Sequence, residues 1–131
     1  MARGAERRQI MAWEHMYSAE SHILIVTVTG LVDRHLWEAQ LRASISEAVS
    51  HSCFRFLVDY RQADMQLGLI DLYERPSYYE EAGMPRSARI AILFAPGTKD
   101  TEFVETVTSN RGYAVKTFAD RHEAVAWLTR P

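Results

Sequence analysis

The sequence predicts an α/β fold whose core is a mixed, mostly parallel five-stranded sheet. Three observations lead to this prediction. Two apolar segments lie near the start of the chain with only a short polar turn between them. After them, short apolar segments alternate with segments in which apolar residues recur at helical spacing, and no linker or repeat divides the chain. Strands that alternate with helices form parallel pairs joined by right-handed crossovers, so the predicted order is β-β-α-β-α-β-α-β-α.

The opening pair of segments predicts a β-hairpin. Residues 13–18 form a modest strand, residues 19–21 a tight turn, and residues 22–29 a strong strand. In this second strand Ile23, Ile25 and Thr27 fall on one face and Leu24, Val26 and Val28 on the other. Because both faces are apolar, we expect a central strand that is covered on both sides, and we expect Gly30 to end it.

The next segments predict a helix and a buried strand. Asp33 is a good N-cap residue, and residues 33–50 carry apolar side chains at helical spacing. Residues 54–59 are nearly all apolar and predict the third strand. The apolar face of the helix is formed by Trp37, Leu41, Ile45 and Val49.

Residues 60–83 are the hardest to interpret, because Gly68 and Pro76 interrupt any long helix. We expect a short turn or helix at residues 69–74 and a helix at residues 76–82. The rest of the chain predicts a strand at 89–94, a loop at 95–97, a helix at 101–111, a strand at 113–118 whose Lys116 indicates a sheet edge, and a final helix after Asp120.

Composition excludes several classes of protein. The chain has 131 residues with 47% hydrophobic and 24% charged residues, which suits one globular domain over residues 1–131. The net charge of −2 lacks the basic excess of a nucleic-acid binder. Cys53 is the single cysteine, and no signal peptide or membrane-spanning segment is evident, so we expect a cytoplasmic protein. Residues 1–12 are expected to form a loosely ordered arm.

Several short segments, taken in order, resemble the SpoIIAA-like and STAS-domain group. This group includes bacterial anti-sigma-factor antagonists and cytoplasmic domains of anion transporters, and the closest resemblance is to small bacterial SpoIIAA-like proteins of unknown function. The matching segments cover roughly residues 20–129. They are Val28-Thr29-Gly30 with Asp33, residues 57–61, Tyr73-Glu74-Arg75-Pro76 with residues 83–86, residues 91–93, Asn110-Arg111-Gly112, Phe118, and Glu123-Ala124 with Trp127-Leu128.

The resemblance implies a β/α superhelix with a mixed sheet, and it implies no established activity, because the similar small proteins have none. In the antagonist branch, a phosphorylatable Ser lies in the loop after the strand that we expect to end at Asp59. The matching residues here, 62–68, contain no Ser or Thr. A kinase switch of that kind is therefore not expected in this chain, because no hydroxyl is present to accept the phosphate.

The first group of candidate site residues follows from the geometry of open α/β sheets. Such sheets bind ligands beyond the carboxyl ends of their strands. The predicted topology brings six residues near that edge, and Gly30 and Asp33 are candidates to join them. The six are Asp59, Tyr60, Arg61, Gly97, Thr98 and Lys99.

The second group consists of tyrosines around Pro76. Tyr73, Tyr78 and Tyr79 lie in the irregular segment, and tyrosine is favoured at interfaces because it has an apolar ring and a polar end. We consider Tyr73 and Tyr78 candidates for partner contact. The alternative is that two of the three cover the core.

Other reactive residues do not form a recognisable motif. The histidines are scattered at positions 15, 22, 35, 51 and 122, without the spacing of metal ligands. Cys53 is expected to pack in the core, and Asp33 and Asp59 are expected to cap a helix and to bond Arg61. We expect no metal, no cofactor and no catalytic residue.

Three hypotheses for function follow. The first is a non-enzymatic interaction or regulatory module that binds an unidentified protein or a second copy of itself, and not nucleic acid. The second is a binder of a small apolar or anionic, lipid-like ligand. The third is a hydrolase or transferase, which would need Asp59 and Lys99 to face each other in one pocket.

Overall fold

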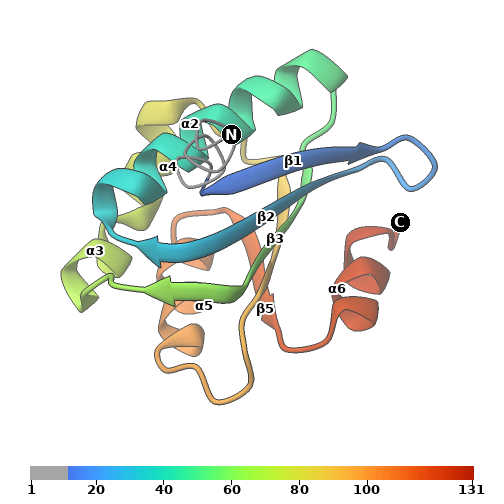
Figure 1. Ribbon diagram of the computed structural model, residues 1–131. Coiled ribbons are helices and arrows are strands. Elements are labelled where there is room, and N and C mark those ends of the chain that lie inside the picture. Colours follow the sequence, from blue (N-terminus) through green and yellow to red (C-terminus); the bar gives the residue numbers. More distant parts are fainter. Residues whose placement is uncertain (1–11) are drawn as a thin grey trace, which may run out of the picture.

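The computed structural model describes residues 12–131, and its centre is a five-stranded sheet in the order β1-β2-β3-β4-β5 (Figure 1). β1 pairs with β2 antiparallel, and the other neighbours pair parallel. The predicted mixed, mostly parallel α/β class is therefore confirmed. The strands are β1 (Trp13–Ser18), β2 (Ile23–Val32), β3 (Arg55–Met65), β4 (Arg89–Leu93) and β5 (Ala114–Phe118).

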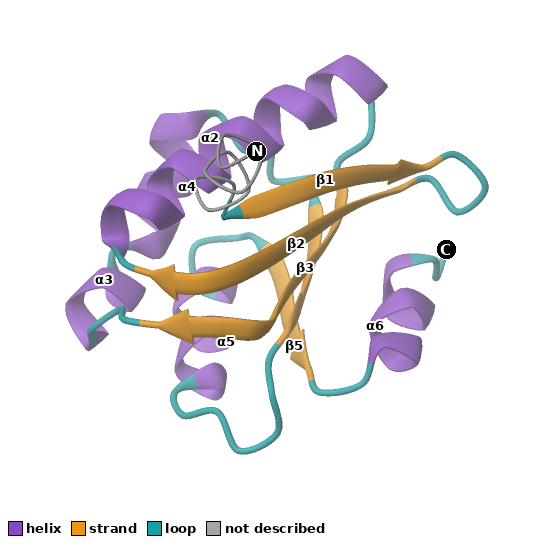
Figure 2. Ribbon diagram, in the orientation of Figure 1, coloured by secondary structure: helices purple, strands orange, loops and turns teal. Residues whose placement is uncertain are grey.

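Helices cover the two faces of the sheet unequally (Figure 2). The helices are α2 (Arg34–His51), α3 (Leu69–Tyr73), α4 (Arg75–Ala82), α5 (Thr101–Ser109) and α6 (Arg121–Leu128). Side chains of α2, α3, α4 and α5 pack on one face around Leu24, Val26 and Phe56. On the other face, α6 packs its Ala124 and Leu128 against the sheet. None of the helices within residues 12–131 is long and apolar enough to cross a membrane.

β2 and β3 are both longer than the sequence predicts. β2 does not end at Gly30 but continues to Val32, and β3 does not end at Asp59 but continues to Met65. The two strands stay paired through the register shift between Thr27 and Thr29. Gly30 has φ of +81° just after this bulge, a conformation that glycine adopts without steric cost. The glycine therefore bends the strand rather than ending it.

The remaining elements follow the predicted boundaries to within a few residues. Asp33 caps α2, because its Oδ1 accepts a hydrogen bond from the Leu36 amide at 2.9 Å, and Asp120 caps α6 through the Glu123 amide. β5 is an edge strand, as Lys116 indicates. Val49 is an exception, since 62% of it is exposed instead of packing inward. The predicted arm at residues 1–12 lies almost entirely outside the described residues.

Candidate functional site

Asp59 and Arg61 form an ion pair on the α6 face of the sheet. The Arg61 amide and Nε both donate to Asp59 Oδ1 at 3.0 Å, and Nη2 donates to Oδ2 at 2.9 Å. Burial pushes the pKa of Asp59 upward, but the hydrogen bonds and charge of Arg61 outweigh it and leave the pKa below its usual value. The carboxylate is thus held ionised by its own strand, as expected for a structural role.

Tyr60 points to the opposite face of β3 and does not join these two residues. It is 2% exposed, and its hydroxyl donates to Gln40 Oε1 at 2.9 Å. Burial raises the pKa of Tyr60 to about 12. The side chain is part of the core under α2, so it is not accessible at the strand edge.

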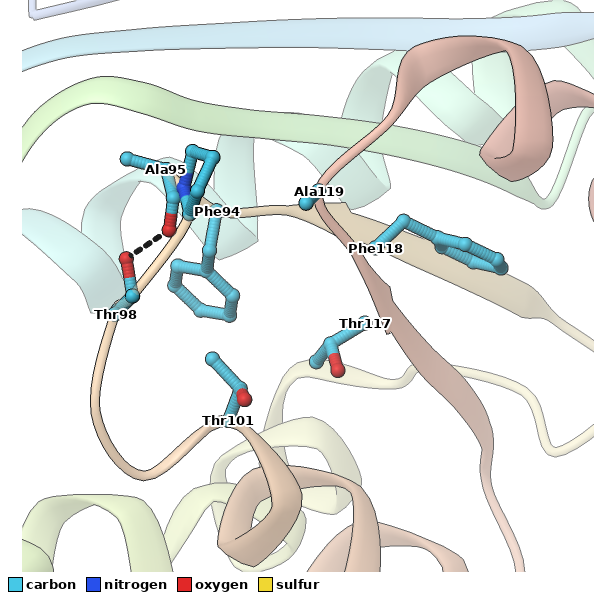
Figure 3. Close-up of a pocket in the computed structure, with 9 residues that line it drawn as sticks. Phe94, Ala95, Thr98, Thr101, Thr117, Phe118 and Ala119 are labelled. Atoms are coloured by element: carbon cyan, nitrogen blue, oxygen red, sulfur yellow. Dashed lines mark hydrogen bonds between the residues drawn. The ribbon is translucent and has the colours of Figure 1, made fainter.

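Gly97 and Thr98 line a shallow pocket of about 220 Å³ beyond the carboxyl ends of β4 and β5 (Figure 3). Thr101 and Thr117 also line it, and Figure 3 shows Thr98 bonded back to its own loop, with Oγ1 donating to the Ala95 carbonyl at 2.6 Å. None of the lining residues carries a charge. The pocket lies where α/β sheets bind ligands, but it offers no general acid, base or nucleophile of ordinary strength.

Lys99 lies elsewhere, at the rim of a second cavity behind α3. This cavity lies on the face of the sheet that α2 to α5 cover, whereas Asp59 lies on the α6 face. Asp59 and Lys99 therefore do not share a pocket, and the geometry gives the hydrolase hypothesis no support. Gly30 is paired within β2 just after the register shift, and Asp33 caps α2.

The three tyrosines near Pro76 have different environments. Tyr73 is 68% exposed, whereas Tyr79 is 1% exposed. Tyr78 is half-buried, and its ring packs edge-on against Trp37 with centroids 5.5 Å apart. Tyr78 and Tyr79 therefore cover the core, which is the alternative interpretation for two of the three tyrosines, and Tyr73 is accessible.

Tyr73 belongs to an exposed apolar surface that the sequence analysis did not identify. Leu69, Ile70 and Tyr73 are spaced to lie along one side of α3, while Leu72 points inward. Leu69 is 58% and Ile70 74% exposed. Leu31 is 57% exposed near the end of β2, but it alternates with Val32, which packs on the same face as Leu72, so its side chain projects from the opposite face of the sheet. We call the three residues Leu69, Ile70 and Tyr73 the α3 surface. The buried side of a short helix is hard to predict from sequence, so no sequence pattern indicated this surface.

Arg75 is the second residue that the sequence analysis missed. It is the first residue of α4, is 3% exposed and lies against Trp37 of α2. Its guanidinium carbon lies 4.8 Å from the centroid of the Trp37 ring, and its Nε donates to the Tyr79 hydroxyl at 3.1 Å. In the sequence Arg75 appeared only as part of a family-like segment, because arginine is rarely buried.

The cysteine and the histidines at positions 15, 22 and 51 have structural partners. Cys53 is fully buried, and its Sγ lies 3.3 Å from the His22 carbonyl oxygen. His15 Nε2 lies 3.0 Å from Ser44 Oγ, and the His51 ring stacks on Tyr17 with centroids 4.3 Å apart. Within residues 12–131, no three His, Cys, Asp or Glu side chains are grouped closely enough to hold a metal ion.

Comparison with known proteins gives structural neighbours only. No family model and no curated protein matches the chain. An uncharacterized protein of the DUF3478 family with a SpoIIAA-like fold, from Shewanella loihica PV-4, matches with a TM-score of 0.59 and 18% identity over 89% of this chain and 92% of that one. An anti-sigma factor antagonist from Mycobacterium paratuberculosis matches with a TM-score of 0.58 and 13% identity, over 90% and 95% of the two chains.

Unphosphorylated SpoIIAA, an anti-sigma factor antagonist, matches with a TM-score of 0.51 and 16% identity, over 89% of this chain and 97% of its own. All these matches cover nearly the whole of both chains, at identities too low to carry function across. They agree with the mixed sheet and helix order found here, which the resemblance implied. The chain therefore has the SpoIIAA-like fold.

Proposed function

We propose that this protein is a non-enzymatic regulatory module that binds another protein through the α3 surface, in the cytoplasm. The observation that carries the proposal is the exposure of three large apolar side chains on one side of α3. Exposed apolar side chains gathered in one place typically mark interaction sites. The fold supports the same role, since two of the similar structures are of anti-sigma factor antagonists.

The charges around the α3 surface indicate the chemistry of the partner. Glu74 follows Tyr73 directly and is exposed, and Asp64, also exposed, lies near the end of β3, which leads into α3. The nearby Arg34 already pairs with Glu38, whose Oε2 lies 3.6 Å from its Nε. The rim is therefore acidic, and the matching partner surface is an apolar segment flanked by Lys or Arg.

A second copy of this chain fits the surface less well. A two-fold dimer would place each α3 surface against the same surface of the other copy. Asp64 and Glu74 of the two copies would then approach each other, and like charges across an interface oppose association. We therefore propose a different protein as the partner, with self-association as an outcome of the test.

Photocrosslinking in the source cells tests this proposal. A photoreactive amino acid replaces Ile70 in one variant and Val49, which is 62% exposed on α2, in a matched control. We expect Ile70 to yield an adduct with one other protein and Val49 to yield none. The charge reversals Asp64→Lys and Glu74→Lys should lower the adduct yield several-fold, whereas Glu81→Lys, an exposed carboxylate on α4, should not.

Three results would contradict the proposal. They are adducts only between copies of this chain, equal adducts from both positions, and no adduct from Ile70. If neither charge reversal changes the yield of the adduct, the proposal that the acidic rim contributes to binding is wrong.

We also propose that this docking is not switched by phosphorylation of residues 62–68. Residues 62–65 continue β3 instead of forming a loop, and residues 66–68 lead into α3. No Ser or Thr is present among them. Mass spectrometry of protein isolated from the source cells should find this peptide unmodified, and a phosphorylated form would overturn the proposal.

A further inference from the structure

The cavity behind α3 has a mixed lining, partly apolar and partly polar, and is large enough for a small organic group. Its volume is about 170 Å³, and an engineered protein cavity of roughly 150 Å³ is known to bind benzene. Leu72 on the inner side of α3, Phe94 after β4 and Val104 on α5 form much of the wall. The remaining lining residues are Met65, Leu67, Arg75, Thr98, Lys99 and Asp100.

Arg75 supplies this wall with a buried positive charge. Arginine stays protonated in proteins, and a buried charge without a partner carries a large desolvation cost. Among the ion pairs of residues 12–131, none includes Arg75. Its neighbours Trp37 and Tyr79 are neutral groups that contact the guanidinium by stacking and hydrogen bonding. The positive charge is thus solvated by rings and a hydroxyl but not balanced by a carboxylate.

Tyr60, which lines a cavity together with Arg75, does not supply a negative charge either. Tyr60 and Arg75 both line a small internal cavity of about 20 Å³. Because burial raises the pKa of Tyr60 to about 12, this phenol stays protonated at neutral pH. Among the described residues, no ion pair therefore balances the charge of Arg75.

The charges at the rim act more weakly than Arg75. Lys99 and Asp100 both line the cavity and both are exposed, so water screens them and their opposite signs largely cancel. The buried guanidinium, in a low-dielectric environment, dominates the field inside. A single arginine suits a planar carboxylate, which accepts two parallel hydrogen bonds from it.

We propose that the cavity binds a small monocarboxylate with a short apolar tail. The carboxylate pairs with Arg75, and the tail lies against Leu72, Phe94 and Val104. This proposal sharpens the hypothesis of a small apolar or anionic ligand. It rests on the cavity and its charge, and it holds whether or not a protein binds the α3 surface.

Titration with hexanoate tests the proposal. Acetate, which lacks the tail, and hexan-1-ol, which lacks the charge, serve as matched probes. We expect saturable changes in the NMR signals of Phe94 and Val104 with hexanoate, and at least ten-fold weaker effects with the other two. Hexanoate should also raise the unfolding temperature, because a ligand that binds only the folded state stabilises it.

Two variants locate the site. Arg75→Met removes the charge but keeps an unbranched side chain, and it should weaken hexanoate binding about ten-fold or more. Arg34→Met, an exposed arginine outside the cavity lining, should bind as the wild type does. If Arg75→Met fails to fold, Val104→Phe provides the test, because it fills the cavity and leaves the charge in place.

The proposal is overturned if hexanoate does not bind, if hexan-1-ol binds equally well, or if the folded variants Arg75→Met or Val104→Phe retain wild-type affinity. These results are independent of the crosslinking from Ile70. Loss of the partner adduct with intact hexanoate binding would reject the docking function alone.

Discussion

Two buried tyrosines differ in whether their hydroxyl has a partner. Tyr60 donates to Gln40 Oε1, and Gln40 Nε2 in turn donates to Ser44 Oγ at 2.9 Å. The Tyr113 hydroxyl is buried and has no hydrogen-bond partner among the described residues. The first hydroxyl is therefore part of a connected polar network inside the core, and the second is not.

Replacing each tyrosine by phenylalanine should separate these two cases. We expect Tyr60→Phe to lower the unfolding free energy by about 1–2 kcal/mol, because it leaves the buried Gln40 Oε1 without its donor. Tyr113→Phe should change it by less than about 0.5 kcal/mol. Urea unfolding followed by circular dichroism measures both. An equal loss in the two variants would show that the network around Gln40 adds no stability.

His15 contacts Ser44 at the end of that network, and its protonation makes the unfolding free energy depend on pH. Burial lowers the pKa of His15 below 6.5, although the charge of Glu47 acts in the opposite direction. Below pH 6.5 the unfolded chain therefore binds more protons than the folded one. The unfolding free energy should fall as the pH decreases from 6.5 through the lower pKa of the folded state.

Comparison of two variants isolates this contribution. His15→Gln should flatten the pH dependence of the unfolding free energy below pH 6.5. His122→Gln changes an exposed histidine on α6 and serves as the matched control. Identical pH profiles for the wild type and His15→Gln would refute the assignment.

At the scale of single residues, local chemistry was predictable and long-range chemistry was not. The cap at Asp33, the bond from Asp59 to Arg61 and the burial of Cys53 depend on neighbours in sequence or on residue type. The buried position of Arg75 depends on Trp37, which is far away in the sequence and belongs to another helix. No local pattern encodes such a contact.

At the scale of elements, the bulge in β3 opposite Thr27 to Thr29 of β2 illustrates why strand lengths were underestimated. Glycine usually marks the end of a strand, yet Gly30 lies inside β2 and pairs with Ala63. Its φ of +81° lets the strand bend and continue. The pairing of residues 29–32 with residues 62–65 then extends β3 as well, so one glycine accounts for both errors.

This reasoning predicts the effect of a side chain at Gly30. A Cβ there would meet nothing within 4 Å, so the cost of substitution comes from the backbone conformation alone. We expect Gly30→Ala to lower the unfolding free energy by about 1–2 kcal/mol, and Gly30→Asn by less, because asparagine tolerates positive φ better. Chemical denaturation measures the difference. Equal stability of the alanine variant and the wild type would contradict it.

At the scale of the whole molecule, the sequence predicted the topology and left the site open. Alternating apolar strands and amphipathic helices were sufficient to predict a parallel sheet with an opening hairpin, because short-range patterns determine them. The predicted edge residues separated because alternate side chains along β3 point to opposite faces: Asp59 and Arg61 face α6, and Tyr60 faces α2. These residues would lie together only if β3 ended at Asp59, but β3 continues to Met65.

The five-residue helix α3 separates the exposed apolar surface from the cavity. Leu72 lines the cavity, while Leu69, Ile70 and Tyr73 face solvent. A helix of this length has no rigid core of its own, so displacement of Leu72 also displaces its outer side chains. Thermodynamic reciprocity then requires that if a carboxylate in the cavity changes the affinity for the docked protein, that protein changes the affinity for the carboxylate by the same factor.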